Sequence, residues 1–253
     1  MRQLKYKLAD QVFVVTGGSR GIGFEITKLL LEQKANVVIC GRKQEGLDAA
    51  AEKLHAGDNL LAVQCHVAKF EEVDALFDKA LKRFGKIDGL INNVGMNIIS
   101  GVVEADPGLW NKIIDSNLNG SFLCSRKAGQ IMRGQKRGKI VSISSIAARR
   151  SAPAMGIYGI AKAGIEMLTR VVAQELAPFN IQVNAVAPGM VRTGFSEPFW
   201  SNKDLHDAII KTIPMGRIAE PIDIAHPVLF LCSEGSNFIT GQTLLVDGGA
   251  SAI

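Results

Sequence analysis

Short apolar runs alternate with segments of helical periodicity from residue 12 to residue 246. The first run, 12–15, contains no polar residue, which is typical of a parallel strand buried on both faces. Similar runs predict strands at 37–40, 60–64, 89–92, 140–143, 181–186 and 244–246. Helices are predicted between them at 22–33, 45–55, 71–84, 106–132, 158–176 and 221–232, the long one at 106–132 being interrupted near 117–120.

This alternation predicts the fold class. Strands that alternate with helices form a parallel sheet covered by helices on both faces, and right-handed crossovers favour a doubly wound Rossmann arrangement. With 253 residues and no internal repeat or linker, we expect a single α/β domain of about seven strands. The segment 194–213 is the least regular part, and we interpret it as a mobile substrate lid.

Charge and hydropathy exclude several classes of protein. The net charge is +5, but Lys and Arg are spread along the chain, so we expect no nucleic-acid partner. The densest basic run, 133–139, is interpreted as a solvated turn; docking of an acyl group on an acidic carrier is the alternative. No apolar run could span a bilayer and residues 1–10 do not form a signal peptide, so we expect a cytoplasmic protein without a membrane partner.

The cysteines favour neither a metal site nor a disulfide framework. Cys40, Cys65, Cys124 and Cys232 are far apart in sequence, and only Cys65 adjoins a histidine, His66. One such pair does not make a metal site, so we expect no metal. Four buried reduced thiols are the simpler interpretation.

The turn at 16–23 joins the first predicted strand to the first helix. Its glycines permit a tight turn and close approach of the backbone to a pyrophosphate, and the helix N-terminus offers free N–H groups. The residues expected to bind it are Gly17, Ser19, Arg20, Gly21, Ile22 and Gly23. Residues 17–21 also fit the G-x-S-x-G motif of the hydrolase nucleophile elbow, which would need a downstream histidine such as His206 or His226.

The end of the second predicted strand indicates which dinucleotide is bound. NAD sites of this kind usually carry an acidic residue about twenty residues after the glycines. Here Gly41 is followed by Arg42 and Lys43. A guanidinium can pair with a 2′-phosphate, with help from Arg20 and Lys43, so NADP(H) is favoured and NAD(H) stays possible. An ordinary surface charge is the other interpretation of Arg42.

Three segments supply candidate catalytic groups. Tyr158 and Lys162 are four residues apart on one helix face, where a nearby ammonium would lower the pKa of the phenol from about 10 and prepare it for proton exchange. Ser145 follows the strand 140–143, at the sheet edge that binds ligands, and can hold a substrate oxygen. Asn117 interrupts a helix and could hold a water in a proton path to Lys162. A Tyr-Lys pair alone would be only a polar helix face.

Taken together, these features resemble the short-chain dehydrogenase/reductase family, including its 3-oxoacyl carrier-protein reductase-like members. The resemblance covers about 8–249. It rests on the turn 16–23, Asn92-Asn93-Val94-Gly95, Asn117, Ser145, Tyr158 and Lys162, Pro188-Gly189 with Thr193, Thr240-Gly241-Gln242, and Val246-Asp247-Gly248-Gly249.

The resemblance implies roles for these residues. Tyr158 would be the acid/base and Ser145 the group that holds the substrate oxygen. Lys162 would bind the nicotinamide ribose, and Asn117 would complete the proton relay. Asp88 would help to hold the central strand, and the C-terminal segment implies a homotetramer. Further cofactor contacts are implied for His66, Val67, Asn93, Val94, Gly95, Pro188, Gly189, Val191 and Thr193.

Two positions depart from the family pattern. His66 stands where family members commonly carry an Asp that contacts adenine, which puts that side-chain contact in doubt but not a backbone contact at Val67. Val94 replaces the usual Ala of the Asn-Asn-Ala-Gly turn, a small change in bulk.

Substrate choice is expected to depend on a mixed set of residues. Apolar members would form a pocket wall, or would simply pack the lid onto the domain. Arg149 and Arg150 would meet an anionic substrate, or would only be solvated. The set comprises Met96, Asn97, Arg149, Arg150, Met155, Met190, Phe195, Phe199 and Trp200.

Three functions follow from this pattern. The first is an NADPH-dependent reductase of a ketone or a 3-oxoacyl group, acting between a carbonyl and a secondary alcohol. The second is an NAD-dependent alcohol, polyol or sugar dehydrogenase on the same scaffold. The third is a non-catalytic nucleotide-binding scaffold, which the complete set of catalytic groups argues against.

Overall fold

The computed structural model describes residues 5–151 and 155–252, so residues 1–4 of the N-terminal segment discussed above lie outside the described residues. Within this part of the chain, seven parallel strands form one sheet in the order β3-β2-β1-β4-β5-β6-β7. The strands are β1 (Val12–Thr16), β2 (Asn36–Gly41), β3 (Leu60–Gln64), β4 (Gly89–Asn92), β5 (Gly138–Ile143), β6 (Ile181–Pro188) and β7 (Thr243–Val246). This is the predicted doubly wound single-domain fold, and the prediction is confirmed.

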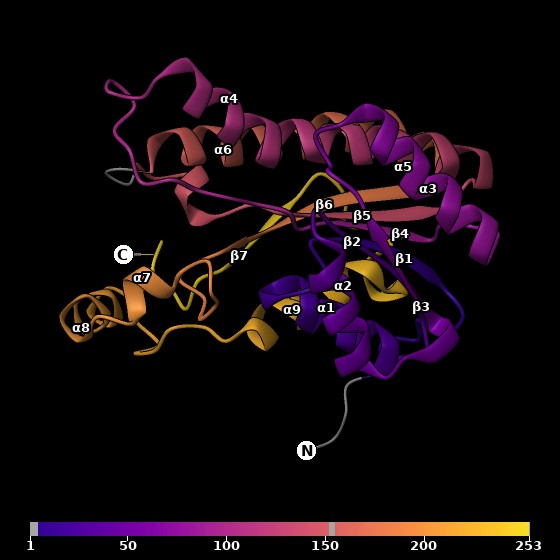
Figure 1. Ribbon diagram of the computed structural model, residues 1–253, viewed down its shortest axis with the longest axis horizontal. Helices are drawn as coiled ribbons and strands as arrows, with labels where there is room; N and C mark the ends of the chain where they lie inside the picture. The colour runs from indigo at the N-terminus through magenta and orange to yellow at the C-terminus, as the bar shows by residue number, and fades with distance from the viewer. Residues whose placement is uncertain (1–4, 152–154, 253) are drawn as a thin grey trace.

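Helices cover both faces of the sheet (Figure 1). On one face lie α1 (Gly21–Glu32), α2 (Gln44–Leu54) and α9 (Pro221–Cys232). On the other lie α3 (Phe70–Phe84), α4 (Pro107–Ile114), α5 (Gly120–Gln135) and α6 (Gly156–Leu176). Each layer has its own apolar core, and the central strands β1, β4, β5 and β6 are buried along their whole length. Continuous apolar runs are what a strand buried between two helical layers requires.

The segment 194–213 is more regular than the sequence suggested. It contains two short helices, α7 (Glu197–Trp200) and α8 (Lys203–Lys211), at the end of the molecule where the strands terminate (Figure 1). Helix α8 begins where the Asn202 side chain accepts hydrogen bonds from the backbone N–H groups of Asp204 and Leu205. The prediction of an irregular segment is therefore wrong, whereas its action as a lid stays a prediction.

A buried carboxylate fixes the centre of the sheet. Asp88 precedes β4, and its side chain accepts a 2.9 Å hydrogen bond from the backbone N–H of Val12 at the start of β1. Lys86 and Arg137 form ion pairs with the same carboxylate at 2.9 and 2.8 Å. The expected role of Asp88 in holding the central strand is thus confirmed.

All four cysteines are free and buried, as predicted. No group of three or more His, Cys, Asp or Glu residues in 5–151 and 155–252 is arranged to hold a metal ion. None of the helices described is long and apolar enough to cross a membrane.

Candidate active site

The turn between β1 and α1 can only be built with glycine at several positions. Gly17 and Gly21 have φ angles of +66° and +56°, in the left-handed region that favours glycine. At Gly23 a Cβ atom would lie 2.3 Å from the carbonyl oxygen of Gly17. The turn therefore folds tightly against the first turn of α1.

The N-terminus of α1 is chemically suited to an anion. Arg20 occupies the N-cap position without a side-chain cap, and the first turn contains no acidic residue. The first N–H groups of a helix have no partner within the helix, and the helix dipole adds positive potential there. The backbone at Ser19, Gly21 and Ile22 thus fits the pyrophosphate of a dinucleotide.

The end of β2 lies beside this turn. A Cβ atom on Gly41 would be 3.9 Å from the Ser19 hydroxyl oxygen. The next residue, Arg42, is exposed; its carbonyl oxygen accepts a 3.0 Å hydrogen bond from Gln64, and its guanidinium has no contact within the described residues. Arg20 and Lys43 are exposed as well. The structure thus leaves three cationic side chains exposed between this turn and the end of β2.

The segment after β3 combines a half-buried histidine with a buried valine. The backbone N–H of His66 donates a 2.7 Å hydrogen bond to Glu72, and its ring nitrogen Nδ1 accepts a bond from the N–H of Ala68. The side chain of Val67 packs closely on Gly120, because a Cβ atom on Gly120 would lie 2.5 Å from a methyl group of Val67. The His66 ring is thus held by its own loop.

Asn93 and Val94 anchor the segment after β4 to the turn after β1. The amide of Asn93 donates to the carbonyl oxygens of Thr16 and Gly17 at 3.0 and 3.1 Å. The backbone N–H groups of Asn93 and Val94 donate to the Thr16 hydroxyl. Two strand ends that flank the candidate cofactor groove are joined in this way.

Asn117 is completely buried in a π-helical turn, Asp115–Asn119, which separates α4 from α5. This turn is the interruption that the sequence predicts. The Asn117 amide donates 2.8 Å hydrogen bonds to the carbonyl oxygens of Met96 and Ile113 and accepts one from the N–H of Met96. A Cβ on Gly95 would lie 3.1 Å from Asn117 Oδ1 and 3.3 Å from Lys162 Nζ, so the backbone at Gly95 lies between these two groups.

Ser145, Tyr158 and Lys162 come together where β5 ends and α6 begins. The Ser145 hydroxyl accepts a 3.1 Å bond from the N–H of Ala147 and is also hydrogen-bonded to the Tyr158 side chain. Lys162 Nζ lies 5.4 Å from the centroid of the Tyr158 ring and donates a 2.8 Å bond to the carbonyl oxygen of Ile143. The sheet and the helix thus bring three predicted groups into one site.

Burial controls the ionisation of this site. It raises the pKa of Tyr158 to about 12, although the hydrogen bond with Ser145 acts in the opposite direction. Burial also lowers the pKa of Lys162 to about 7. The expected lowering of the Tyr158 pKa is therefore wrong for the chain alone, because desolvation outweighs the effect of a lysine that points to Ile143 and not to the phenol oxygen.

The two arginines considered for an anionic substrate are already engaged. Arg149 Nε pairs with the buried carboxylate of Glu166 at 3.1 Å, and the same carboxylate contacts the Ser144 hydroxyl at 3.3 Å. Arg150 donates a 3.1 Å bond to the carbonyl oxygen of Ala250. Arg149 is therefore not purely solvated, because it links the loop after β5 to α6, whereas its contact with a substrate stays a prediction.

The segment after β6 reaches back to the turn between β1 and α1. Gly189 follows Pro188 and lies so close to β7 that a Cβ there would be 3.0 Å from the Cα atom of Asp247. Val191 is buried, and the methyl group of Thr193 would lie 3.4 Å from a Cβ on Gly21. The segment after β6 and the turn after β1, which are far apart in the sequence, therefore lie side by side.

Among the predicted substrate residues, only some approach Tyr158. The Phe195 ring lies 5.9 Å from the Tyr158 ring and remains 48% exposed. Met155 packs beside Tyr158 in a small apolar cluster. Asn97 has a buried side-chain oxygen without a partner among the described residues. Phe195 and Met155 thus lie beside Tyr158, and the backbone of Met96 is bonded to Asn117.

The others belong to the lid and its base. The indole nitrogen of Trp200 donates to the Thr193 carbonyl oxygen, so Trp200 joins α7 to the segment that precedes the lid. Phe199 is half-buried in the same helix. Met190 borders a hollow of about 170 Å³ formed by the segments after α8 and β7. A role of Trp200, Phe199 and Met190 in substrate binding stays a prediction.

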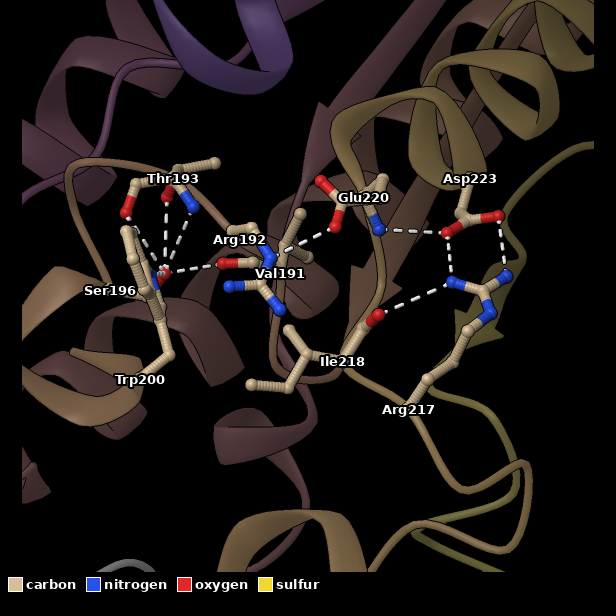
Figure 2. Close-up of polar contacts among 9 residues, drawn as sticks. All are labelled: Val191, Arg192, Thr193, Ser196, Trp200, Arg217, Ile218, Glu220 and Asp223. Atoms are coloured by element: carbon tan, nitrogen blue, oxygen red, sulfur yellow. Dashed lines mark hydrogen bonds and ion pairs between the residues drawn. The ribbon is translucent and has the colours of Figure 1, made fainter. Parts of the chain in front are cut away.

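Several residues that position the site carry no signal in the sequence. Ser196 and the pair of Arg192 with Glu220 organise the base of the lid (Figure 2). Ser144 and Glu166 support the loop that bears Ser145. One contact, between Ser196 and Trp200, could have been predicted from their spacing of four residues at the start of α7. The others join segments that are far apart in the chain.

The hydrolase interpretation of the turn finds no partner histidine. His226 Nδ1 lies 3.0 Å from the Tyr6 hydroxyl, and His206 contacts Asp207 within α8. Neither histidine contacts Ser19 in the part of the chain that the structure describes. A Ser-His pair is therefore absent from this turn.

Known proteins share both sequence and structure with this chain. A family model described as enoyl-(acyl carrier protein) reductase matches residues 17–251. Human dehydrogenase/reductase SDR family member 4 is 37% identical over 96% of this chain and 88% of its own length. Human dehydrogenase/reductase SDR family member 2, mitochondrial, is 37% identical over 95% and 86%. A solved structure from Brucella melitensis, named short-chain dehydrogenase/reductase SDR:glucose/ribitol dehydrogenase, superposes with a TM-score of 0.92 at 30% identity, covering 98% of this chain and 99% of its own.

Proposed function

The chain belongs to the short-chain dehydrogenase/reductase family, and from this membership we propose that it is an NADP(H)-dependent reductase that converts a ketone to a secondary alcohol. The assembly of Ser145, Tyr158 and Lys162 beside the phosphate-binding turn carries the proposal. These groups surround one position at the carboxyl edge of the sheet, where ligands bind in open α/β folds.

Ser145 and Tyr158 act on the same substrate oxygen in this proposal. Both hydroxyls can donate to an oxygen that gains negative charge, and donors fixed in advance stabilise such charge without reorganisation. Tyr158 is a neutral phenol at pH 7, since burial raises its pKa to about 12, so it is prepared to give a proton to a developing alkoxide. A bound nicotinamide supplies the hydride at the carbonyl carbon. Tyr158 thus carries the proton that a reduction requires.

Lys162 and Asn117 maintain the proton supply to Tyr158. We propose that Lys162 also binds the nicotinamide ribose, and that Asn117 holds a water on the path from solvent. Gly95 supports this arrangement, because a side chain there would collide with both groups. The burial of Asn117 and Lys162 keeps bulk water out of the relay.

Arg42 is proposed to select NADP(H). It is exposed and unpaired among the described residues, and it follows Gly41 directly beside Ser19. A guanidinium binds phosphate oxygens in a bidentate manner. The remaining cofactor contacts are proposed for the turn 16–23, the backbone at Val67, the Asn93–Gly95 segment and the 188–193 segment.

The substrate is proposed to be an uncharged ketone. Arg149 and Arg150 are engaged with Glu166 and Ala250, so they do not offer a free cation to a carboxylate or phosphate. Phe195 presents an exposed ring to Tyr158. This arrangement favours a ketone over a 3-oxoacyl group carried by an acidic protein, the other reduction considered.

We further propose that the protein acts in the cytoplasm as a homotetramer. Apolar side chains stay exposed on α5, α6 and β7, among them Phe122, Met167 and Leu244. Such surfaces are typical of interfaces between subunits. Light scattering after size-exclusion chromatography tests the assembly.

An NAD-dependent alcohol, polyol or sugar dehydrogenase is the second candidate. The Brucella melitensis structure carries the name glucose/ribitol dehydrogenase, and the fold of this chain follows it closely. A preference for NAD⁺ with a polyol would support this candidate. The third candidate, a nucleotide-binding scaffold, predicts tight cofactor binding without turnover.

Nicotinamide absorbance follows the oxidation of NADPH or NADH over time, and the choice of substrate separates the candidates. NADPH and NADH are each compared on an aryl ketone, a 3-oxoacyl thioester, an enoyl thioester, a quinone and a keto sugar. Faster turnover of the aryl ketone with NADPH supports the proposal. Turnover of the keto sugar or the enoyl thioester alone overturns it.

A further inference from the structure

Ser196 is a buried hydroxyl on a loop whose neighbouring residues are exposed. It is 5% exposed, whereas Phe195 before it and Glu197 after it face solvent. Its hydroxyl donates a hydrogen bond to the carbonyl oxygen of Val191. It accepts bonds from the backbone N–H of Thr193 at 3.2 Å and from the indole nitrogen of Trp200 at 3.1 Å (Figure 2). One donor and two acceptor sites are the full capacity of a serine hydroxyl.

Trp200 extends this contact to the base of the lid. Its indole nitrogen lies 3.1 Å from the Thr193 carbonyl oxygen as well. The guanidinium of Arg192 lies 5.2 Å from the Trp200 ring centroid and pairs with Glu220 at 2.9 Å. Helix α7 is therefore tied both to the segment that precedes the lid and to the segment that follows it (Figure 2).

The segments that precede and follow the lid are joined by two backbone hydrogen bonds. Val191 and Ala219 form an isolated parallel bridge, in which Arg192 N–H donates to Ala219 and Ala219 N–H donates to Met190. Between these residues, the Phe195 ring contacts Tyr158 and the Met215 N–H donates to the carbonyl oxygen of Gly248, while the remaining polar contacts around Ser196 lie within the lid and its base. The Ser196 hydroxyl is bonded to Val191, one of the two residues of this bridge.

Thr193 and Phe195 flank these contacts and face different parts of the candidate site. The Thr193 methyl group lies near Gly21 in the phosphate-binding turn. The Phe195 ring lies 5.9 Å from the Tyr158 ring. Ser196 touches neither Gly21 nor Tyr158, yet its hydrogen bonds fix the backbone that carries both neighbours.

We propose that Ser196, together with Trp200, is a positioning latch that holds Thr193 toward the cofactor and Phe195 toward the substrate at the same time. The inference rests on the proposed function. Loss of the Ser196 hydroxyl would remove the acceptor of the half-buried Thr193 N–H, the donor to the Val191 carbonyl oxygen and one of the two acceptors of the Trp200 indole, and the lid would then lose its fixed orientation at both sites.

The variant Ser196→Ala tests the latch. The dissociation constant for NADPH, measured by fluorescence titration without substrate, rises about tenfold, and the KM for the ketone rises by a similar factor. The kcat at saturation and its pH profile stay close to those of the wild type, since the proton-transfer groups are unchanged. Ser196→Thr, which keeps the hydroxyl, restores both constants.

Two further variants sharpen the test. Ser201→Ala is the matched control, because Ser201 lies in the same lid with an exposed side chain, and it leaves both constants unchanged. In a Trp110→Phe background Trp200 is the one remaining tryptophan, so its emission reports the latch directly. Ser196→Ala shifts that emission to longer wavelength if the latch opens.

The results separate the latch from the function on which it rests. Unchanged NADPH affinity and unchanged KM in Ser196→Ala overturn the latch, as does a fall in kcat with both constants unchanged. A wild-type protein that binds neither NADPH nor NADH overturns the proposed function instead.

Discussion

Lys162 Nζ lies 2.8 Å from the carbonyl oxygen of Ile143, so the side chain of α6 is bonded to the last residue of β5. Lys162 is 2% exposed, and no carboxylate pairs with it in the described part of the chain. Its positive charge thus has only neutral partners among the described residues, the Ile143 carbonyl group and the face of the Tyr158 ring. Burial lowers its pKa to about 7, which places the loss of this charge near neutral pH.

The first prediction concerns the stability of the cofactor-free protein as a function of pH. The folded pKa of Lys162 lies below its unfolded value, so the unfolded chain binds more protons between pH 7 and about 10.5. This group therefore adds stability as the pH rises through that window and removes it as the pH falls toward 7. Urea unfolding of the wild type and of Lys162→Met between pH 6.5 and 9 measures the difference.

The free energy of unfolding is expected to rise more steeply with pH in the wild type than in Lys162→Met, by up to ~1.4 kcal/mol per pH unit. Parallel curves for the two proteins would contradict the lowered pKa. Carbon-13 NMR of labelled lysine side chains gives an independent check, with one lysine titrating near pH 7.

The second prediction concerns proton transfer by Tyr158. Tyr158→Phe removes the phenol oxygen and keeps the ring that packs beside Phe195. We expect kcat to fall by about 10²- to 10⁴-fold, the range typical of a lost general acid, while NADPH affinity changes little. Stopped-flow turnover and fluorescence titration measure the two effects. Substantial residual turnover would exclude Tyr158 as the proton donor.

The third prediction concerns cofactor choice. Arg42→Ala is expected to weaken NADPH binding by about tenfold or more and to leave NADH binding nearly unchanged, because only NADPH carries a 2′-phosphate. Lys53→Ala is the control, since it removes the same charge from an exposed position at the other end of α2. Calorimetric titration with both cofactors measures the ratio; equal losses would mean that Arg42 does not bind the phosphate.

The fourth prediction compares two glycines. A Cβ at Gly23 would lie 2.3 Å from the Gly17 carbonyl oxygen, so Gly23→Ala is expected to displace the turn, lower the melting temperature and abolish cofactor binding. Gly46 in α2 has nothing within 4 Å of such an atom, so Gly46→Ala is expected to stabilise the protein by up to about 1 kcal/mol. Thermal melts with and without NADPH distinguish them. Tight NADPH binding by Gly23→Ala would contradict the close approach seen at this turn.

The sheet was the most predictable part of this molecule. The predicted strands 60–64 and 89–92 coincide with β3 and β4, because buried parallel strands have continuous apolar runs bounded by polar or glycine residues. The turn before α1 was equally predictable from the sequence, since the positive φ angles of Gly17 and Gly21 favour glycine at these positions. Such features depend on local sequence and need no knowledge of distant contacts.

The lid was less predictable for a physical reason. Helix α7 has four residues, too short for a periodic pattern. Helix α8 did carry a signal, in the Asn202 cap followed by Leu205 and Ile209 at helical spacing. This helical signal was weak, because most residues of α8 face solvent and are polar.

The electrostatics of the site depended on burial and on side-chain direction. The spacing of Tyr158 and Lys162 correctly placed them together on one face, yet it could not show that Lys162 points to Ile143. Likewise, the sequence left Arg149 free, whereas the fold brings Glu166 to it. Pairings of this kind join segments that only the folded chain brings together.

Thr193 and Gly21 lie close together although they are far apart in the sequence. On the proposed placement, a dinucleotide at this contact holds the two segments together and binds only the folded protein. Mass action then adds about 2.7 kcal/mol to the stability when the cofactor is present at one hundred times its dissociation constant. The nicotinamide pool of the cell would thereby set the lifetime of this protein against proteolysis as well as its rate of turnover.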